Sequence, residues 1–377
     1  MEMFGLTTTP LILFFILYGV PGVVPLIAVL YLLLCPGNAF APDVTPPVRL
    51  RRWAASFFAI IALGHVWWMA FYINHGDHSS MDGYFHSATY WCLVVLDYVT
   101  LFTSIAGTLL AMLQDRRRPV WPVFAAVMPF VVMGGVLIVN PCMMLMQITF
   151  VYFLLLFALF TVYVMFAVKQ YERWLNDNYA DLENKKVWLT HVLLLVFMLM
   201  FILYAFVDVN STVLIYLLHI LELAIFGLLL WRVETLPRLS PLPLPVREGS
   251  EYSNDDIEQR VVVLDLEWIE QLLKEHCIAT QLYLRNDLTL QQLAQAVGTN
   301  RFYLSQYFSR NGITYNTYIN NLRINHFIDR YEKLIADGQS VVAQELAQES
   351  GFRSYRTFSR AFMQRMGQSV TTWTIKR

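Results

Sequence analysis

The sequence has little charge for its length. Only 15% of its 377 residues are Asp, Glu, Lys or Arg, and 57% are hydrophobic. Soluble domains carry about 25% charged residues and under about 50% apolar ones. The composition therefore excludes a disordered chain, a coiled coil and a wholly soluble enzyme. The four cysteines form no CxxC pair, so neither a disulfide framework nor a zinc module is indicated.

Long stretches of the first 233 residues contain no charge at all. Seven stretches, four of them free of any charge and three with a single acidic residue, have about 20 or more predominantly apolar residues, the length of helix that crosses a bilayer. The expected helices cover 10–34, 53–74, 88–113, 120–139, 142–168, 188–208 and 211–231. Residues 1–233 are therefore predicted to form a seven-helix transmembrane bundle.

Basic residues are absent from every second connection of this bundle. The N-terminus and the loops near 75–87, 140–141 and 209–211 contain no Lys or Arg, whereas the loops at 49–52, 116–118 and 169–186 contain several. Loops rich in Lys and Arg stay in the cytoplasm. The pattern predicts an N-terminus outside the cell and a cytoplasmic C-terminal half.

A few ionisable residues lie deep in the predicted spans, where such groups are costly and default to functional candidates. They are His65, Asp97, His219 and Glu222, and the last two share a helix face because they are three residues apart. One interpretation is a buried polar site that receives a ligand or a proton as signal. The other is interhelical hydrogen bonding that holds the bundle together.

The predicted outer loop contains His75, His78 and His86. Imidazoles can bind a transition metal or titrate near pH 6.5. No fixed metal-ligand spacing is present, however, and a hydrophilic loop explains the composition. We expect no metal site and no cofactor.

Catalytic motifs are also missing. Residues 1–233 contain no nucleophile elbow, phosphate-binding loop or HExxH sequence, so we expect no enzyme activity. Residues 234–262 follow as a cytoplasmic linker, with four prolines between 236 and 245 and an acidic, polar stretch after them. Proline fixes φ and lacks an amide donor, so this linker is predicted to be extended and solvated.

The last part, 263–377, has the helical spacing of apolar residues that a soluble domain shows. Thr289 can cap a helix, Gly298 allows a tight turn, and Asn300 can cap a second helix. The same order returns about fifty residues later around Gly351. A helix, a glycine turn and a helix form the helix-turn-helix arrangement, and a long helix over about 315–335 separates the two copies.

These motifs resemble the AraC/XylS family of bacterial transcription regulators. The resemblance covers about 265–377, and its residues are Leu290-x-x-Leu-Ala, Leu304-Ser-x-x-Phe308, Gly312, Tyr318-Ile-x-x-Leu-Arg323, Leu346-Ala-x-x-Ser-Gly-Phe352, Phe358-Ser-Arg-Ala-Phe362, Gly367 and Trp373. It implies an all-helical domain in which two helix-turn-helix units read successive major grooves. Phe327 and Val370 depart from the family pattern, which has a small alanine and a proline there. The architecture resembles membrane-tethered members of Bacteroidetes-type bacteria.

The resemblance also implies which residues contact DNA. From Thr299 onward, eleven basic residues stand against five acidic ones, which fits a DNA-binding face. Base readout is assigned to Phe302, Ser305, Gln306, Tyr355, Arg356, Thr357 and Arg360. Phosphate contacts are assigned to Arg301, Arg310 and Arg353.

Taken together, the sequence predicts an all-α, multi-pass protein of the bacterial inner membrane that binds specific DNA and receives a signal through its membrane half. The alternative is a membrane transporter or sensor-enzyme with a regulatory DNA-binding tail. The expected partners are double-stranded promoter DNA, the lipid bilayer, RNA polymerase and a second copy of the chain, together with an unidentified signal ligand.

Overall fold

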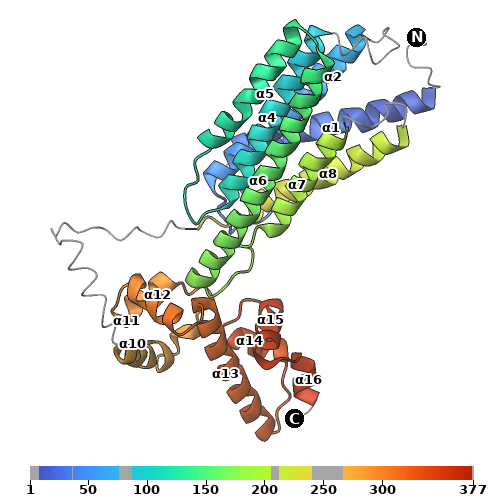
Figure 1. Ribbon diagram of the computed structural model, residues 1–377. Coiled ribbons are helices and arrows are strands. Elements are labelled where there is room, and N and C mark those ends of the chain that lie inside the picture. The colour runs from blue at the N-terminus through green and yellow to red at the C-terminus, as the bar shows by residue number, and fades with distance from the viewer. Residues whose placement is uncertain (1–7, 36, 76–86, 205–211, 240–265, 376–377) are drawn as a thin grey trace, which may run out of the picture. The chain divides into compact units, whose positions relative to one another are not determined.

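The computed structural model describes residues 8–35, 37–75, 87–204, 212–239 and 266–375. The structure is 78% helical and has no strand among these residues, so the all-α prediction is confirmed. The chain forms two compact units (Figure 1). The first unit comprises 1–169 and 186–240, and the second comprises 170–185 and 241–377.

Apolar helices lying side by side make up the first unit. They are α1 (Thr8–Leu34), α2 (Val48–His75), α4 (Ala88–Met112), α5 (Trp121–Val139), α6 (Met143–Asn178), α7 (Trp188–Tyr204) and α8 (Thr212–Thr235). Over its described residues, each of the seven predicted segments thus coincides with a helix. Within the described residues, four stretches are long and apolar enough to span a membrane: Val48–Phe71, Ala88–Met112, Trp121–Val139 and Met143–Asn178.

The bundle is held by aromatic packing and by close helix approach. Phe57 and Phe58 of α2 pack against Phe226 of α8 with ring centroids 6.0 and 5.7 Å apart. Gly107 of α4 allows α2 to come close, because a Cβ at this position would lie only 2.1 Å from the ring of Trp53. These contacts bring α2, α4 and α8 together.

Polar contacts join several helix ends at one end of the first unit. Arg51 forms an ion pair with the buried Glu234 at 3.0 Å, and Arg49 donates to the carbonyl oxygen of Arg118 at 2.7 Å. Gln114 donates to the carbonyl of Pro237 at 3.0 Å, and Leu236 is fully buried. The described start of the predicted linker, up to 239, therefore packs against the bundle, because its backbone and Leu236 find partners there. The remainder of the linker, 240–262, lies outside the described residues.

The regular elements of the second unit are helices within its described residues. It contains α10 (Leu266–Leu273), a π-helical turn at 274–278, a 3-10 turn at 282–284, α11 (Leu290–Val297), α12 (Arg301–Arg310), α13 (Tyr315–Ala336), α14 (Ala343–Glu349), α15 (Tyr355–Met366) and α16 (Val370–Ile375). The helical run that begins with α10 ends before Tyr283, since Gln281 adopts a left-handed conformation with φ 55°.

Helix α13 connects two small cores. Ile319 belongs to the first core, which includes the buried faces of α11 and α12. Ile324 and Phe327 belong to the second, with residues of α14, α15 and α16. The predicted separating helix thus shares its apolar residues between both helix-turn-helix units and sets the distance between them.

Candidate nucleic-acid interface

The first helix-turn-helix unit is built by the caps and turn that the sequence predicts. The Thr289 side chain accepts from the backbone N–H of Gln292, whose side chain accepts from the N–H of Thr289 in return, a capping box. Gly298 ends α11 with φ 75°, and Asn300 caps α12 through the N–H of Tyr303. This geometry makes α12 the second helix of the unit, the position that a reading helix occupies in a helix-turn-helix.

Side chains of α12 divide into a buried and an exposed set. Leu304 and Phe308 are buried in the first core, whereas Phe302 is 53% exposed. Ser305 is exposed, and Gln306 is half-buried. These three residues, to which base readout is assigned, therefore lie outside the core. Arg310, with an assigned phosphate contact, is exposed at the last turn of the helix.

The second helix-turn-helix unit requires its glycine for two reasons. Gly351 has φ 87°, and a Cβ there would lie 2.6 Å from the carbonyl oxygen of Leu284. Only glycine allows this approach of the turn to the backbone of the 3-10 segment. After the turn, Ser354 caps α15 by accepting from the N–H of Thr357.

Helix α15 presents the more basic reading face. Arg356 and Arg360 are exposed and lie four residues apart on one side, while Phe358 and Phe362 are fully buried on the other. The Arg353 side chain, just before the helix, is 59% exposed. The two exposed guanidinium groups thus lie on the helix to which readout of guanine edges in a major groove is assigned.

Two residues assigned to base readout have contacts of their own. Tyr355 packs its ring against Phe358, with centroids 5.7 Å apart, so part of its surface belongs to the second core. The Thr357 hydroxyl donates to Glu183 at 3.3 Å. The structure thus brings all seven assigned readout residues onto α12 and α15, but it does not test their roles.

The two departures from the family pattern are accommodated in the second core. Phe327 is fully buried and lies with its ring 4.4 Å from Phe358 and 6.4 Å from Trp373. Val370 is buried in the same cluster at the start of α16. Both residues fill the interior, away from the exposed side chains of α15.

A buried arginine, known from the sequence only as part of a motif, ties the two helix-turn-helix units together. Arg323 of α13 is 1% exposed, and its Nε and Nη2 donate to the carbonyl oxygens of Tyr283 and Arg285 at 2.8 and 2.6 Å. Its guanidinium also lies 5.6 Å from the ring centre of Phe352. Burial lowers the pKa of Arg323 to about 10, which still leaves it charged at neutral pH.

The second unit also contains an acidic stretch that no motif in the sequence singled out. Residues 177–183, at the end of α6 and in the loop after it, include Asp177, Asp181 and Glu183. Asp181 lies 4.0 Å from the guanidinium of Arg353. Burial lowers the pKa of Arg301, and the nearby Tyr179 and Asp177 oppose this shift. No local signal in the sequence marks this proximity, since more than a hundred positions separate the partners.

Comparison with known proteins agrees with this geometry. Residues 293–375 match a family model described as a helix-turn-helix domain, and no curated protein or solved structure matches the chain. The second unit therefore carries a helix-turn-helix DNA-binding domain, which makes the chain a DNA-binding regulator. More particularly, the matched domain is of the AraC type, which confirms this part of the resemblance.

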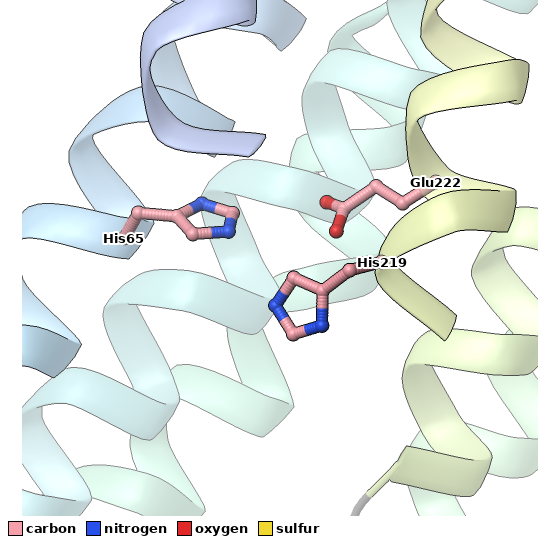
Figure 2. A group of neighbouring side chains, drawn as sticks. All are labelled: His65, His219 and Glu222. Atoms are coloured by element: carbon pink, nitrogen blue, oxygen red, sulfur yellow. The ribbon is translucent and has the colours of Figure 1, made fainter. Parts of the chain in front are cut away.

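The four ionisable residues predicted to lie deep in the first unit are also placed by the structure. His65, His219 and Glu222 offer ligand atoms that all lie within 4.8 Å of one another (Figure 2). Asp97 is not among these three ligand residues, and its Oδ2 accepts from the indole N–H of Trp68 at 3.0 Å. The loop candidates His78 and His86, together with the side chain of His75, lie outside the described residues.

Proposed function

We propose that this chain is a membrane-tethered, sequence-specific transcription regulator whose seven-helix half receives the signal. The observation that carries the DNA-binding part is the pair of capped reading helices, α12 and α15, which keep polar and basic side chains outside two separate cores. The proposal assigns no catalytic step to the chain, and it includes promoter DNA, RNA polymerase and a second copy of the chain as partners.

The surface of the first unit supports a position in the bilayer. Leu155, Leu159 and Phe166 on α6 are 58, 70 and 68% exposed, and they follow one another at helical spacing. Contiguous apolar surface of this extent is unfavourable in water and favourable against lipid chains. Such outward-facing apolar stripes are the expected surface of a membrane-spanning helix bundle.

The polar end of the bundle supports the proposed orientation. Three of the predicted cytoplasmic segments meet there, through the contacts of Arg49 with Arg118 and of Arg51 with Glu234. The fourth joins them because Arg232 donates to the carbonyl oxygen of Lys186. Basic segments gathered at one end are the arrangement that keeps that end cytoplasmic. We therefore propose seven spans in the bacterial inner membrane, with the N-terminus outside and the DNA-binding unit in the cytoplasm.

Substitution of the exposed arginines tests the DNA-binding assignment. A DNA duplex is first selected by the purified full chain from random sequences. Arg356→Ala and Arg360→Ala should each weaken binding to this duplex by ~1–3 kcal/mol and relax its sequence preference, because a bidentate contact to guanine is lost. Arg310→Ala should weaken selected and unrelated duplexes alike, since a phosphate contact carries no sequence information.

The readout is the ratio of affinities for the selected and the unrelated duplex, measured by fluorescence anisotropy in detergent solution. An equal loss for both duplexes in all three variants would contradict the assignment of α15 as a base-reading helix. Failure of the unsubstituted chain to select any sequence would contradict the proposed function itself.

A further inference from the structure

The first inference concerns the polar group inside the helix bundle. His65 on α2 and His219 with Glu222 on α8 face the same space from two helices (Figure 2). The His219 side chain is 8% exposed, and the other two are half-buried. We propose that these three side chains form a binding site for a divalent transition metal ion of the Zn²⁺ class.

The ligand types fit this class of ion. Two imidazoles and one carboxylate are a set that zinc uses in proteins when a fourth position remains for water or another ligand. Imidazole nitrogen favours Zn²⁺, Cu²⁺ and Ni²⁺ over Mg²⁺ and Ca²⁺, which prefer oxygen ligands. A divalent ion would also compensate the carboxylate charge that Glu222 otherwise brings among apolar helices.

The tautomer of His65 supports metal binding through its second nitrogen. Its Nδ1 lies 2.9 Å from the carbonyl oxygen of Ile61. A carbonyl oxygen only accepts, so Nδ1 carries the proton and Nε2 carries the lone pair that a metal needs. Hydrogen bonding of the far nitrogen to a backbone carbonyl is how metal-binding histidines are commonly oriented.

The neighbouring helices fix the position of this histidine. A Cβ at Gly22 of α1 would lie 3.3 Å from the Cβ of His65, so α1 closes one side of the group. The rings of His65 and His219 have centroids 6.1 Å apart. Tetrahedral zinc with bonds of ~2.0–2.1 Å requires ligand atoms ~3.4 Å apart. The three ligand atoms lie within 4.8 Å of one another, so a bound ion would have to draw them together by up to ~1.4 Å.

Metal titration of the full chain in detergent tests the site. After chelator treatment and dialysis, the protein should bind one equivalent of Zn²⁺ per chain. Glu222→Gln and His219→Gln should each weaken binding by more than ~100-fold, since removing even an indirect partner of a metal ligand costs ~10–100-fold. The matched control replaces His75, His78 and His86 together by Gln, and it should bind as the unsubstituted chain does.

Cobalt spectroscopy of the unsubstituted chain makes the test independent of variant folding. Co²⁺ in a four-coordinate site of nitrogen and oxygen ligands should give an intense visible band without thiolate absorption. No zinc uptake, a weak six-coordinate cobalt spectrum, or binding that is lost with the three loop histidines but kept in Glu222→Gln would each overturn the proposal.

A second inference rests on different residues, those of the acidic stretch 177–183, and on the proposed DNA contacts. This stretch is anchored in the second unit. The N–H of Ala180 donates to Leu288 at 3.3 Å, and Asn316 donates to the carbonyl oxygens of Tyr179 and Ala180 at 3.2 and 2.6 Å. Ala180 itself is fully buried in the first core.

Because the backbone of this stretch is anchored, its carboxylates lie next to side chains to which DNA contacts are assigned. Asp181 lies beside Arg353, and Glu183 accepts from the Thr357 hydroxyl. Asp177 is close enough to Arg301 to affect its pKa. The stretch therefore contacts residues at the start of α15, and its Asp177 acts electrostatically on Arg301 at the start of α12.

We infer that residues 177–183 act as an autoinhibitory cover that competes with DNA for the reading helices. The same guanidinium and hydroxyl groups cannot serve a carboxylate and DNA at once, and a carboxylate near the DNA backbone repels phosphate. Since α6 begins at Met143 and ends at Asn178, the cover is continuous with an apolar helix of the first unit. A change in that helix can therefore release or strengthen the cover.

Neutral substitution of the acids in the full chain tests this cover. The triple variant Asp177→Asn, Asp181→Asn, Glu183→Gln should bind the selected duplex ~10-fold more tightly, because apparent affinity rises with the fraction of uncovered protein. Glu172→Gln is the matched control, since Glu172 lies on the same extension and forms no hydrogen bond or ion pair with either reading helix among the described residues. It should bind as the unsubstituted chain does.

Unchanged or weaker binding by the triple variant, in a chain that does select DNA, would overturn the cover and leave the proposed function intact. Equal tightening by Glu172→Gln would also overturn it, because general charge repulsion would then explain the gain. Absence of DNA binding in every variant would instead overturn the proposed function on which the cover rests.

Discussion

Two ionisable side chains, Cys277 and Arg323, are buried inside the DNA-binding unit. Cys277 is fully buried in the first core, and burial raises the pKa of its thiol to about 12. Arg323 lies nearby in the fold, and its hydrogen bonds to backbone carbonyls stabilise its charged form despite burial. At neutral pH the Cys277 thiol therefore stays protonated and the Arg323 guanidinium stays charged inside this small domain.

Cys277 should therefore resist alkylation until strongly alkaline pH. Below pH ~9 the Cys277 thiol is protonated in both the folded and the unfolded chain. Between pH ~9 and 12 the thiol loses its proton only in the unfolded chain, so the free energy of unfolding falls as the pH rises through this range. Iodoacetamide at pH 8, followed by peptide mass mapping, should modify the exposed Cys35 and Cys142 much faster than Cys277. Equal labelling of all three would contradict the burial of Cys277.

Gly351 should tolerate alanine much less than Gly298 does. Both have a positive φ, but only at Gly351 does a Cβ meet backbone atoms, whereas nothing lies within 4 Å at Gly298. Gly351→Ala should lower the opening free energy of α15 by about 3 kcal/mol, and Gly298→Ala that of α11 by about 1 kcal/mol. Native-state hydrogen exchange of the full chain measures both, and a similar loss at the two positions would contradict the close approach to Leu284.

At the scale of elements, helix α6 is much longer than its apolar part. Helix α6 has 36 residues, about 54 Å of helix, whereas the hydrocarbon core of a bilayer is about 30 Å thick. Its apolar part agrees with the segment expected at 142–168, and its polar end extends the helix to Asn178 because no glycine or proline interrupts it. This polar end is the part that belongs to the second unit.

Loss of a helix cap should weaken one element selectively. Thr289→Ala removes the acceptor for the N–H of Gln292 and should destabilise α11 by ~1 kcal/mol. Thr371→Ala on the exposed side of α16 is the matched control, with an expected change under ~0.5 kcal/mol. Hydrogen exchange in α11 is the readout. Unaltered protection after Thr289→Ala would show that the capping box contributes nothing to this helix.

At the scale of the whole molecule, the proposed regulator requires a defined orientation of its two ends. Reporter fusions after Asn210 should be active outside the cell, and fusions after Arg118 or Pro245 should be active in the cytoplasm, because the basic segments stay inside. A fusion after Pro245 that reports outside would make DNA binding impossible and would contradict the proposed function. The fusion after Arg118 is the internal control for the fusion after Pro245, because both are expected in the cytoplasm.

Much of this organisation is determined by local sequence. Apolar segments of span length, glycine turns and capping residues act over a few positions, and so the helices, the two helix-turn-helix units and the exposed set of Phe302, Arg356 and Arg360 were predictable. The four polar residues of the apolar half were also recognisable from their type and depth. The matched helix-turn-helix family confirms the domain, and the roles of single DNA contacts stay predictions.

Long-range proximity is what only the tertiary structure decided. That His65, His219 and Glu222 converge while Asp97 bonds to Trp68 depends on how α2, α4 and α8 pack and rotate, which hydropathy does not specify. The contact of Asp181 with Arg353 likewise joins residues that are far apart in the chain. Patterns in the sequence reflect the energetics of local conformation and of burial. The packing of whole helices, in contrast, decides which charged or ligating groups meet, because many weak contacts together select one arrangement.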